Sequence, residues 1–168
     1  MNLNELMALA YAAHEGQTDK SGKPYILHPM RVALNVFGKA VELEVFRGIP
    51  KETFQLAVKA CIGHDLIEDT AVTLDDLRDK GLEEEVVLAI EHLTKVKGET
   101  YPDFIRRCME NQIASIAKVC DIVDNSDVSR IPPELRTPKD AARAAKYRLA
   151  LLQLGVKEQE LQWLLVYE

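Results

Sequence analysis

Apolar residues recur at intervals of three and four along almost the whole chain, which is the spacing of amphipathic helices. In the first segment this stripe is formed by Leu3, Leu6, Met7, Ala10 and Tyr11. The same spacing, interrupted at glycine and proline, predicts helices from residue 4 to about residue 15, over 29–39, onward from Pro50, from Thr73 to Gly81, and over 82–94, 101–110, 113–126, 140–154 and 157–166.

No segment alternates apolar and polar residues as a half-buried strand would, and neither a repeat nor a low-complexity linker interrupts the pattern. A length of 168 residues suits one domain with a sizeable core. The sequence therefore predicts an all-α fold, a single-domain compact bundle of seven to nine helices spanning residues 1–168.

The charge and the cysteine content of the chain limit the possible partners and the cellular compartment. The chain has 27 acidic and 21 basic residues, a net charge of -6, and no long basic run, so nucleic acid is not an expected partner. Cys61, Cys108 and Cys120 are far apart in sequence and lie among apolar neighbours, as reduced buried thiols do. With neither a leader nor a membrane-spanning pattern, we expect a cytoplasmic protein.

The segment from Gly63 to Thr70 concentrates four polar side chains at the end of an apolar helix: His64, Asp65, Glu68 and Asp69. Each helical residue advances about 100°, so all four fall within about 140° of arc and can face one cavity. Burying carboxylates is costly unless a cation compensates them. A bound divalent metal is one explanation; a solvated helix end facing Lys or Arg is the other.

Two more candidate ligands lie elsewhere in the sequence. His28 precedes Pro29 where a polar loop enters a helix, and Asp121 lies inside an apolar helix. Either could be structural, since His28 could bond to backbone and Lys118 could pair with Asp121. Asn125 is four residues after Asp121 and shares its helix face, as a substrate-contacting group would.

Two histidines and two aspartates would suit Mn, Fe or Zn, because imidazole disfavours Mg and Ca. Such a metal lowers the pKa of a bound water and polarises a phosphoryl oxygen. Glu68 and Asp69 are then placed to orient and deprotonate that water. The residues thus predict a metal-dependent phosphohydrolase.

At this point the motifs resemble a known family. They are similar to the HD-domain phosphohydrolases in the order His28, His64-Asp65, Asp121, and more closely to the hydrolase domain of the RelA/SpoT enzymes. The closer resemblance is carried by His14-Glu15-Gly16-Gln17, by Ser21-Gly22-Lys23-Pro24-Tyr25-Ile26-Leu27-His28-Pro29 and by His64-Asp65-Leu66-Ile67-Glu68-Asp69-Thr70, and more weakly by Thr94, 118–127 and 146–148. Because the chain stops at Glu168, it resembles the stand-alone small alarmone hydrolases.

The resemblance implies a helical bundle of the HD-domain type that removes the 3′-pyrophosphate of ppGpp or pppGpp, usually with Mn²⁺. Carried over by position, it implies metal ligation by His28, His64, Asp65 and Asp121, water activation by Glu68 and Asp69, nucleoside contact by Asn125, and an entrance lined by Tyr25 and Lys20.

One departure from the family pattern concerns the base. The family usually has a basic residue near the guanine where this chain has Asp19, and Lys23 replaces a common glutamate. Because an acid cannot stack on a base as a cation does, ppApp or NADPH stays open as a substrate. A different HD phosphohydrolase that acts on a nucleoside monophosphate or a cyclic nucleotide is a separate alternative. A silent alarmone-binding module is a further alternative. The small nucleotide is the only expected partner, with neither nucleic acid nor membrane, and the oligomeric state is left open.

Overall fold

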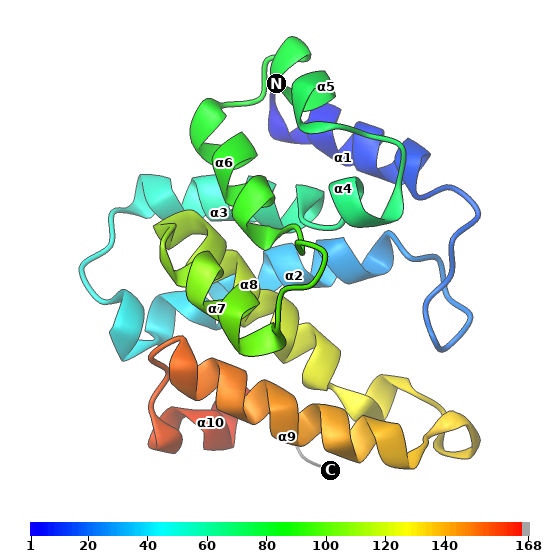
Figure 1. Cartoon of the computed structure of the whole chain (residues 1–168), viewed down its shortest axis with the longest axis vertical. Coiled ribbons are helices and arrows are strands. Elements are labelled where there is room, and N and C mark those ends of the chain that lie inside the picture. The colour runs from blue at the N-terminus through cyan, green and yellow to red at the C-terminus, as the bar shows by residue number, and fades with distance from the viewer. Residues whose placement is uncertain (166–168) are drawn as a thin grey trace.

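Helix α8 (Gln112–Ser126) runs through the centre of the fold, and nearly every residue in it is buried. The computed structural model describes residues 1–165, except the side chain of residue 141. Helices α2 (Leu27–Gly38) and α3 (Lys51–Gly63) make the most extensive contacts with α8 and with each other. This three-helix centre brings segments that are far apart in sequence into one core (Figure 1).

The remaining helices surround this centre. They are α1 (Leu3–Ala13), α4 (Leu66–Asp69), α5 (Leu74–Asp79), α6 (Glu84–Leu93), α7 (Tyr101–Met109), α9 (Pro138–Gln153) and α10 (Glu158–Leu164), with 3₁₀ turns at Ala40–Glu42, Glu44–Phe46, Val128–Arg130 and Pro133–Leu135. Figure 1 shows α1 and α5 at one end of the molecule and α9 and α10 at the other. Position 166, where the last helix was expected to end, lies outside the described residues.

The all-helical prediction is confirmed. Within residues 1–165 the only β pairing is an isolated bridge between Thr18 and Pro24 in the loop before α2. All three cysteines are buried and free, as expected. None of the described helices has both the length and the apolarity needed to cross a bilayer.

Side-chain caps set two helix starts. Thr73 and Asp76 form a capping box at the start of α5, in which each side chain accepts from the other residue's backbone amide. At α1 the helix begins at Leu3, one residue before the expected start at residue 4. Asn2 and Glu5 form the capping box there, so the helix begins at the first residue of the apolar stripe.

The helix that carries His64 and Asp65 does not continue through Asp69, which corrects the single-arc expectation. Helix α3 ends at Gly63, and α4 restarts at Leu66 with Asp65 as its N-cap residue. His64 Nδ1 lies 2.7 Å from the Cys61 carbonyl oxygen, which a continuous helix would offer to the amide of residue 65. The imidazole thus competes with the helix ladder at the place where the chain breaks.

The turn between α9 and α10 depends on a glycine, which gives a test of the packing at that end. Gly155 has φ +88°, and a Cβ there would lie 2.8 Å from Val45 Cγ2. Gly98 has a similar φ of +87° but open space around it. Left-handed backbone costs a side-chain-bearing residue about 1–2 kcal/mol, and overpacking adds about 1–3 kcal/mol.

We therefore expect Gly155→Ala to lower the free energy of unfolding by about 2–4 kcal/mol and Gly98→Ala by only about 1 kcal/mol, measured by urea denaturation. Adding Val45→Ala to Gly155→Ala should recover part of the loss. Equal losses in the two glycine variants would show that contact with Val45 contributes nothing.

Candidate metal centre

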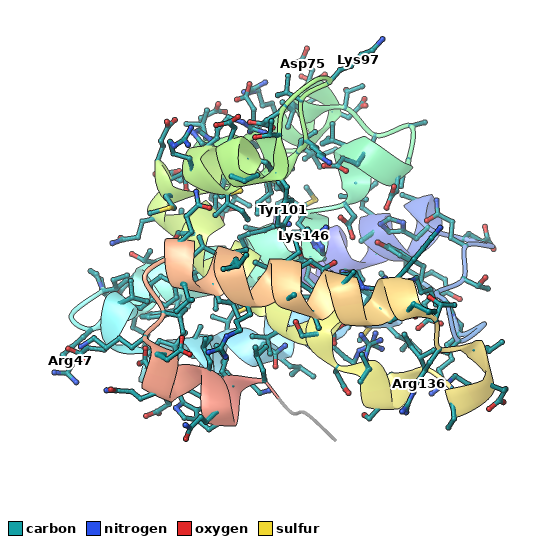
Figure 2. The ribbon with its side chains drawn as sticks, turned by 60° about the horizontal axis from the view of Figure 1, so that its bottom comes forward. Arg47, Asp75, Lys97, Tyr101, Arg136 and Lys146 are labelled. Atoms are coloured by element: carbon teal, nitrogen blue, oxygen red, sulfur yellow. The ribbon has the colours of Figure 1, made fainter. Side chains whose placement is uncertain are left out.

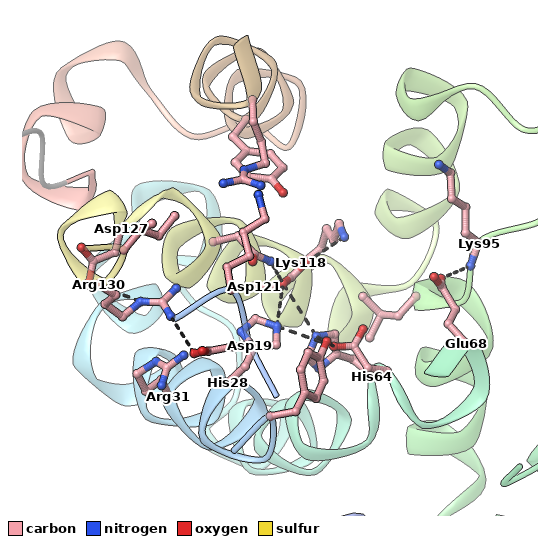
Figure 3. Close-up of a pocket in the computed structure, with 18 of the residues that line it drawn as sticks. Asp19, His28, Arg31, His64, Glu68, Lys95, Lys118, Asp121, Asp127 and Arg130 are labelled. Carbon is pink, nitrogen blue, oxygen red and sulfur yellow. Dashed lines mark hydrogen bonds and ion pairs between the residues drawn. The ribbon is translucent and has the colours of Figure 1, made fainter. Parts of the chain in front are cut away.

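Four predicted ligands converge at the base of a cavity of about 430 Å³ (Figure 3). One ligand atom from each of His28, His64 and Asp65 lies within 4.8 Å of the other two. Asp121 closes the group, with its Oδ1 3.3 Å from His28 Nε2 and 3.7 Å from His64 Nε2. Asp65 Oδ2 lies 3.0 Å from His64 Nε2 and 3.6 Å from His28 Nε2.

Each histidine is held so that its Nε2 atom faces the centre of this group. His28 Nδ1 donates to Asp124 Oδ2 at 2.7 Å, and His64 Nδ1 donates to the Cys61 carbonyl oxygen at 2.7 Å. Carboxylate and carbonyl partners of this kind fix the tautomer of metal-binding histidines. His64 Nε2 is buried and, although Asp65 Oδ2 lies 3.0 Å away, it makes no well-directed hydrogen bond with any of the described residues. Two nitrogen and two carboxylate donors fit a divalent transition metal.

The electrostatics of the cluster favour a cation. Burial alone would raise the pKa of Asp121, but Lys118 and the two histidines lower it well below its usual value. Burial likewise opposes ionisation of Asp65, yet His64 beside it lowers the pKa to about 2. Burial would lower the pKa of His64, and the carboxylates of Asp65 and Asp121 outweigh it and raise that pKa. The site therefore holds positive charge, which a metal can supply in place of protons.

The two oxygens of Asp121 have different partners. Lys118 donates to Oδ2 at 2.8 Å, so the structural ion pair considered from the sequence is present. Oδ1 faces the histidines and accepts from Asn125 Nδ2 at 2.5 Å. Asp121 can thus pair with Lys118 and offer its other oxygen to a metal.

Of the two predicted water-activating residues, only one lines the cavity. Glu68 lines the cavity, and its carboxylate accepts from the backbone amide of Lys95. Asp69 is not among the described residues that line the cavity, which corrects the expectation that all four side chains of the segment face it. The break at Asp65 changes the helical angles on which that expectation depended. Gln17 Nε2 donates to the Asp69 carbonyl oxygen at 2.8 Å and ties this end of α4 to the loop after α1.

The three predicted substrate contacts all line the cavity. Tyr25 reaches deeper than an entrance residue, because its hydroxyl donates to Asp65 Oδ2 at 2.5 Å. Lys20 forms an ion pair with Asp140 at 3.2 Å. Asn125 lies beside Asp121, as their spacing on α8 predicts.

Asp124 is a buried residue that the sequence analysis missed. Besides accepting from His28, it accepts from Arg31 Nε at 2.8 Å and pairs with Arg130 at 3.1 Å. The available signal was its position three residues after Asp121 in the same apolar helix. Asp124 connects a proposed metal ligand to two arginines that line the cavity.

Asp19 also lines the cavity and closes a tight loop. Its Oδ1 accepts from the Ser21 amide and hydroxyl and from the Lys23 amide, at 2.7–3.0 Å. Its Oδ2 lies 4.0 Å from Arg130 Nη1. A guanidinium therefore stands beside the residue where the family pattern has its own basic side chain, although it comes from the segment after α8.

Comparisons with known proteins agree with this architecture. The chain matches a solved structure, described as a metazoan ortholog of SpoT that hydrolyzes ppGpp, with a TM-score of 0.72 over 96% of this chain and 92% of that one, at 21% identity. The fold is therefore that of the helical HD-domain hydrolases, as predicted. No family model matches the chain.

The sequence resemblance is confirmed as well: the chain is a homologue of (p)ppGpp 3′-pyrophosphohydrolases. The Aquifex aeolicus guanosine-3′,5′-bis(diphosphate) 3′-pyrophosphohydrolase is 32% identical over 120 residues, 67% of this chain and 15% of that protein. The Escherichia coli bifunctional (p)ppGpp synthase/hydrolase SpoT is 36% identical over 75 residues, 45% of this chain and 9% of that protein. The chain thus spans a small part of the length of these relatives.

The hydrogen bond from His28 to Asp124 predicts a measurable effect on metal affinity. Asp124→Asn keeps the side-chain size but removes the charge behind the imidazole, so we expect Mn²⁺ affinity to fall by about 10–100-fold. Asp127→Asn is the matched control, because Asp127 pairs with Arg130 and contacts neither histidine. Titration calorimetry with Mn²⁺ measures both. Equal affinities in the two variants would contradict the role assigned to Asp124.

Proposed function

We propose that this protein is a metal-dependent guanosine-3′,5′-bis(diphosphate) 3′-pyrophosphohydrolase that cleaves (p)ppGpp to GDP or GTP and pyrophosphate. The observation that carries the proposal is the pair of histidines whose Nε2 atoms face two carboxylates at the base of one cavity. The activities for which the similar proteins are named point to the same reaction.

His28, His64, Asp65 and Asp121 would hold the metal, for which we propose Mn²⁺. A metal in this position supplies a water of lowered pKa and stabilises charge on the phosphoryl oxygens. Glu68 would orient that water and accept its proton, since Glu68 lines the cavity, whereas Asp69 does not line it and is not proposed to contact the water. Asn125 would contact the nucleoside and position Asp121, while Tyr25 would orient Asp65 and Lys20 would lie at the entrance.

We also propose the domain organisation, the cellular compartment and the partners of this protein. The described residues share one hydrophobic core, which supports a single domain over residues 1–168. Three free buried thiols support a reducing compartment such as the cytoplasm. We propose no partner beyond the nucleotide.

A nucleotide panel tests the activity. Purified protein with Mn²⁺ is given ppGpp, pppGpp, ppApp, NADPH and GMP, and pyrophosphate and orthophosphate are measured separately. We expect pyrophosphate from ppGpp and pppGpp, no orthophosphate from GMP or NADPH, and loss of turnover after EDTA treatment that Mn²⁺ restores. Because Asp19 stands beside the cavity, we expect ppApp to be cleaved at a rate within about tenfold of that of ppGpp, a gap of about 1.4 kcal/mol.

Orthophosphate as the main product would instead identify a phosphatase. Metal-dependent binding of ppGpp without turnover would identify an alarmone-binding module. Either result contradicts the proposed function.

A further inference from the structure

The cavity has more basic residues than its carboxylates neutralise. The basic residues that line it are Lys20, Arg31, Lys95, Lys118, Arg130, Arg143 and Lys146. Five form ion pairs with aspartates: Lys20 and Arg143 with Asp140, Arg31 and Arg130 with Asp124, and Lys118 with Asp121. Lys95 and Lys146 have no carboxylate partner among the described residues. The cavity wall therefore has two ammonium groups without a carboxylate partner in the part of the chain that the structure describes.

Lys146 lies against two aromatic rings on this wall. Figure 2 shows Lys146 next to Tyr101, and its Nζ is 4.2 Å from the centre of that ring. The centre of the Tyr147 ring is 5.1 Å away. These contacts hold the ammonium group at the cavity while its hydrogen-bond donors stay available. Burial, together with the positive charges of Lys95 and Lys118, lowers the pKa of Lys146. An anion bound there would relieve that repulsion.

A second, independent observation points to a ligand at the same place. The hydroxyl oxygen of Tyr101, a residue that lines the cavity, is buried and has no hydrogen-bond partner among the described residues. Buried polar atoms in native proteins are almost always satisfied. A ligand oxygen that accepts from the Tyr101 hydroxyl and from Lys146 Nζ would satisfy both groups.

This pair lies next to the proposed metal centre. The ring of Tyr101 packs on Phe104 at 6.2 Å between centroids, and Lys118 Nζ lies 4.6 Å from the Phe104 ring. Lys118 in turn pairs with Asp121 at 2.8 Å. A continuous line of contacts therefore leads from Asp121 to Tyr101 and Lys146.

We propose that Lys146 and the Tyr101 hydroxyl form a subsite for a phosphate group of the substrate other than the one at the metal ligands. The subsite rests on the proposed function and deepens it, because it selects nucleotides that carry more than one phosphate group. A phosphate offers acceptor oxygens and negative charge, and the two side chains supply donors and positive charge. The phosphate is either the outer one of the cleaved diphosphate or one on the 5′ side.

Steady-state kinetics with ppGpp and Mn²⁺ test the subsite. A charge-assisted hydrogen bond to phosphate would contribute to the free energy of substrate binding. We therefore expect Lys146→Met to raise KM about tenfold or more, with kcat within about twofold. Tyr101→Phe removes only the hydroxyl and should raise KM in the same direction, whereas Lys146→Arg should retain affinity. Lys139→Met is the matched control, because it removes an exposed lysine from the same helix that does not line the cavity.

Calorimetry with the Mn²⁺-loaded protein distinguishes the two phosphates, using pyrophosphate and GDP as probes. Weaker binding of pyrophosphate to Lys146→Met identifies the outer phosphate of the cleaved group, and weaker binding of GDP identifies the 5′ side. Unchanged binding of both probes with unchanged KM overturns the subsite. Wild-type protein that does not cleave ppGpp refutes the proposed function instead, while the pyrophosphate titration still tests the subsite.

Discussion

The carboxylate of Asp121, buried in the middle of the central helix, is the constraint on which the rest of the structure depends. Taking a carboxylate out of water costs several kcal/mol unless charges and hydrogen bonds compensate it. Lys118 satisfies one oxygen from the same helix, and the other is approached by His28 from α2 and by His64 from the C-terminal end of α3. The packing of these three helices therefore also brings the side chains of the site together.

The charge distribution divides the cavity above this centre into two sides. On one side Asp19 and Asp124 neutralise Arg130, and Asp124 also orients His28. On the other side Lys95 and Lys146 have no carboxylate partner among the described residues. The compensated side is suited to fixing geometry and the uncompensated side to receiving phosphate, because only an unpaired cation gains a new partner when an anion binds.

Local patterns predicted the helical class, the helix periods and the four clustered ligands, because periodicity and ligand chemistry are visible in short segments. The break at Asp65 was not predicted, since it depends on a bond between the His64 side chain and a backbone carbonyl. Asp124 could have been predicted, because it lies three residues after Asp121 in the same helix. The contact between Tyr101 and Lys146, in contrast, joins residues 45 positions apart and depends on how α7 packs against α9. Contacts of that kind are set by tertiary packing and have no signature in a single sequence.

The proposed site separates the residues that would hold the metal from Glu68, which would act on the water. The most direct test of this division of roles is to measure bound manganese and kcat together in His64→Ala and Glu68→Gln, with Glu85→Gln on the exposed face of α6 as the control. We expect His64→Ala to lose both metal and turnover, whereas Glu68→Gln should keep its metal and lose about 10²–10⁴-fold in kcat. A Glu68→Gln protein without metal, or a His64→Ala protein that retains it, would contradict this division of roles.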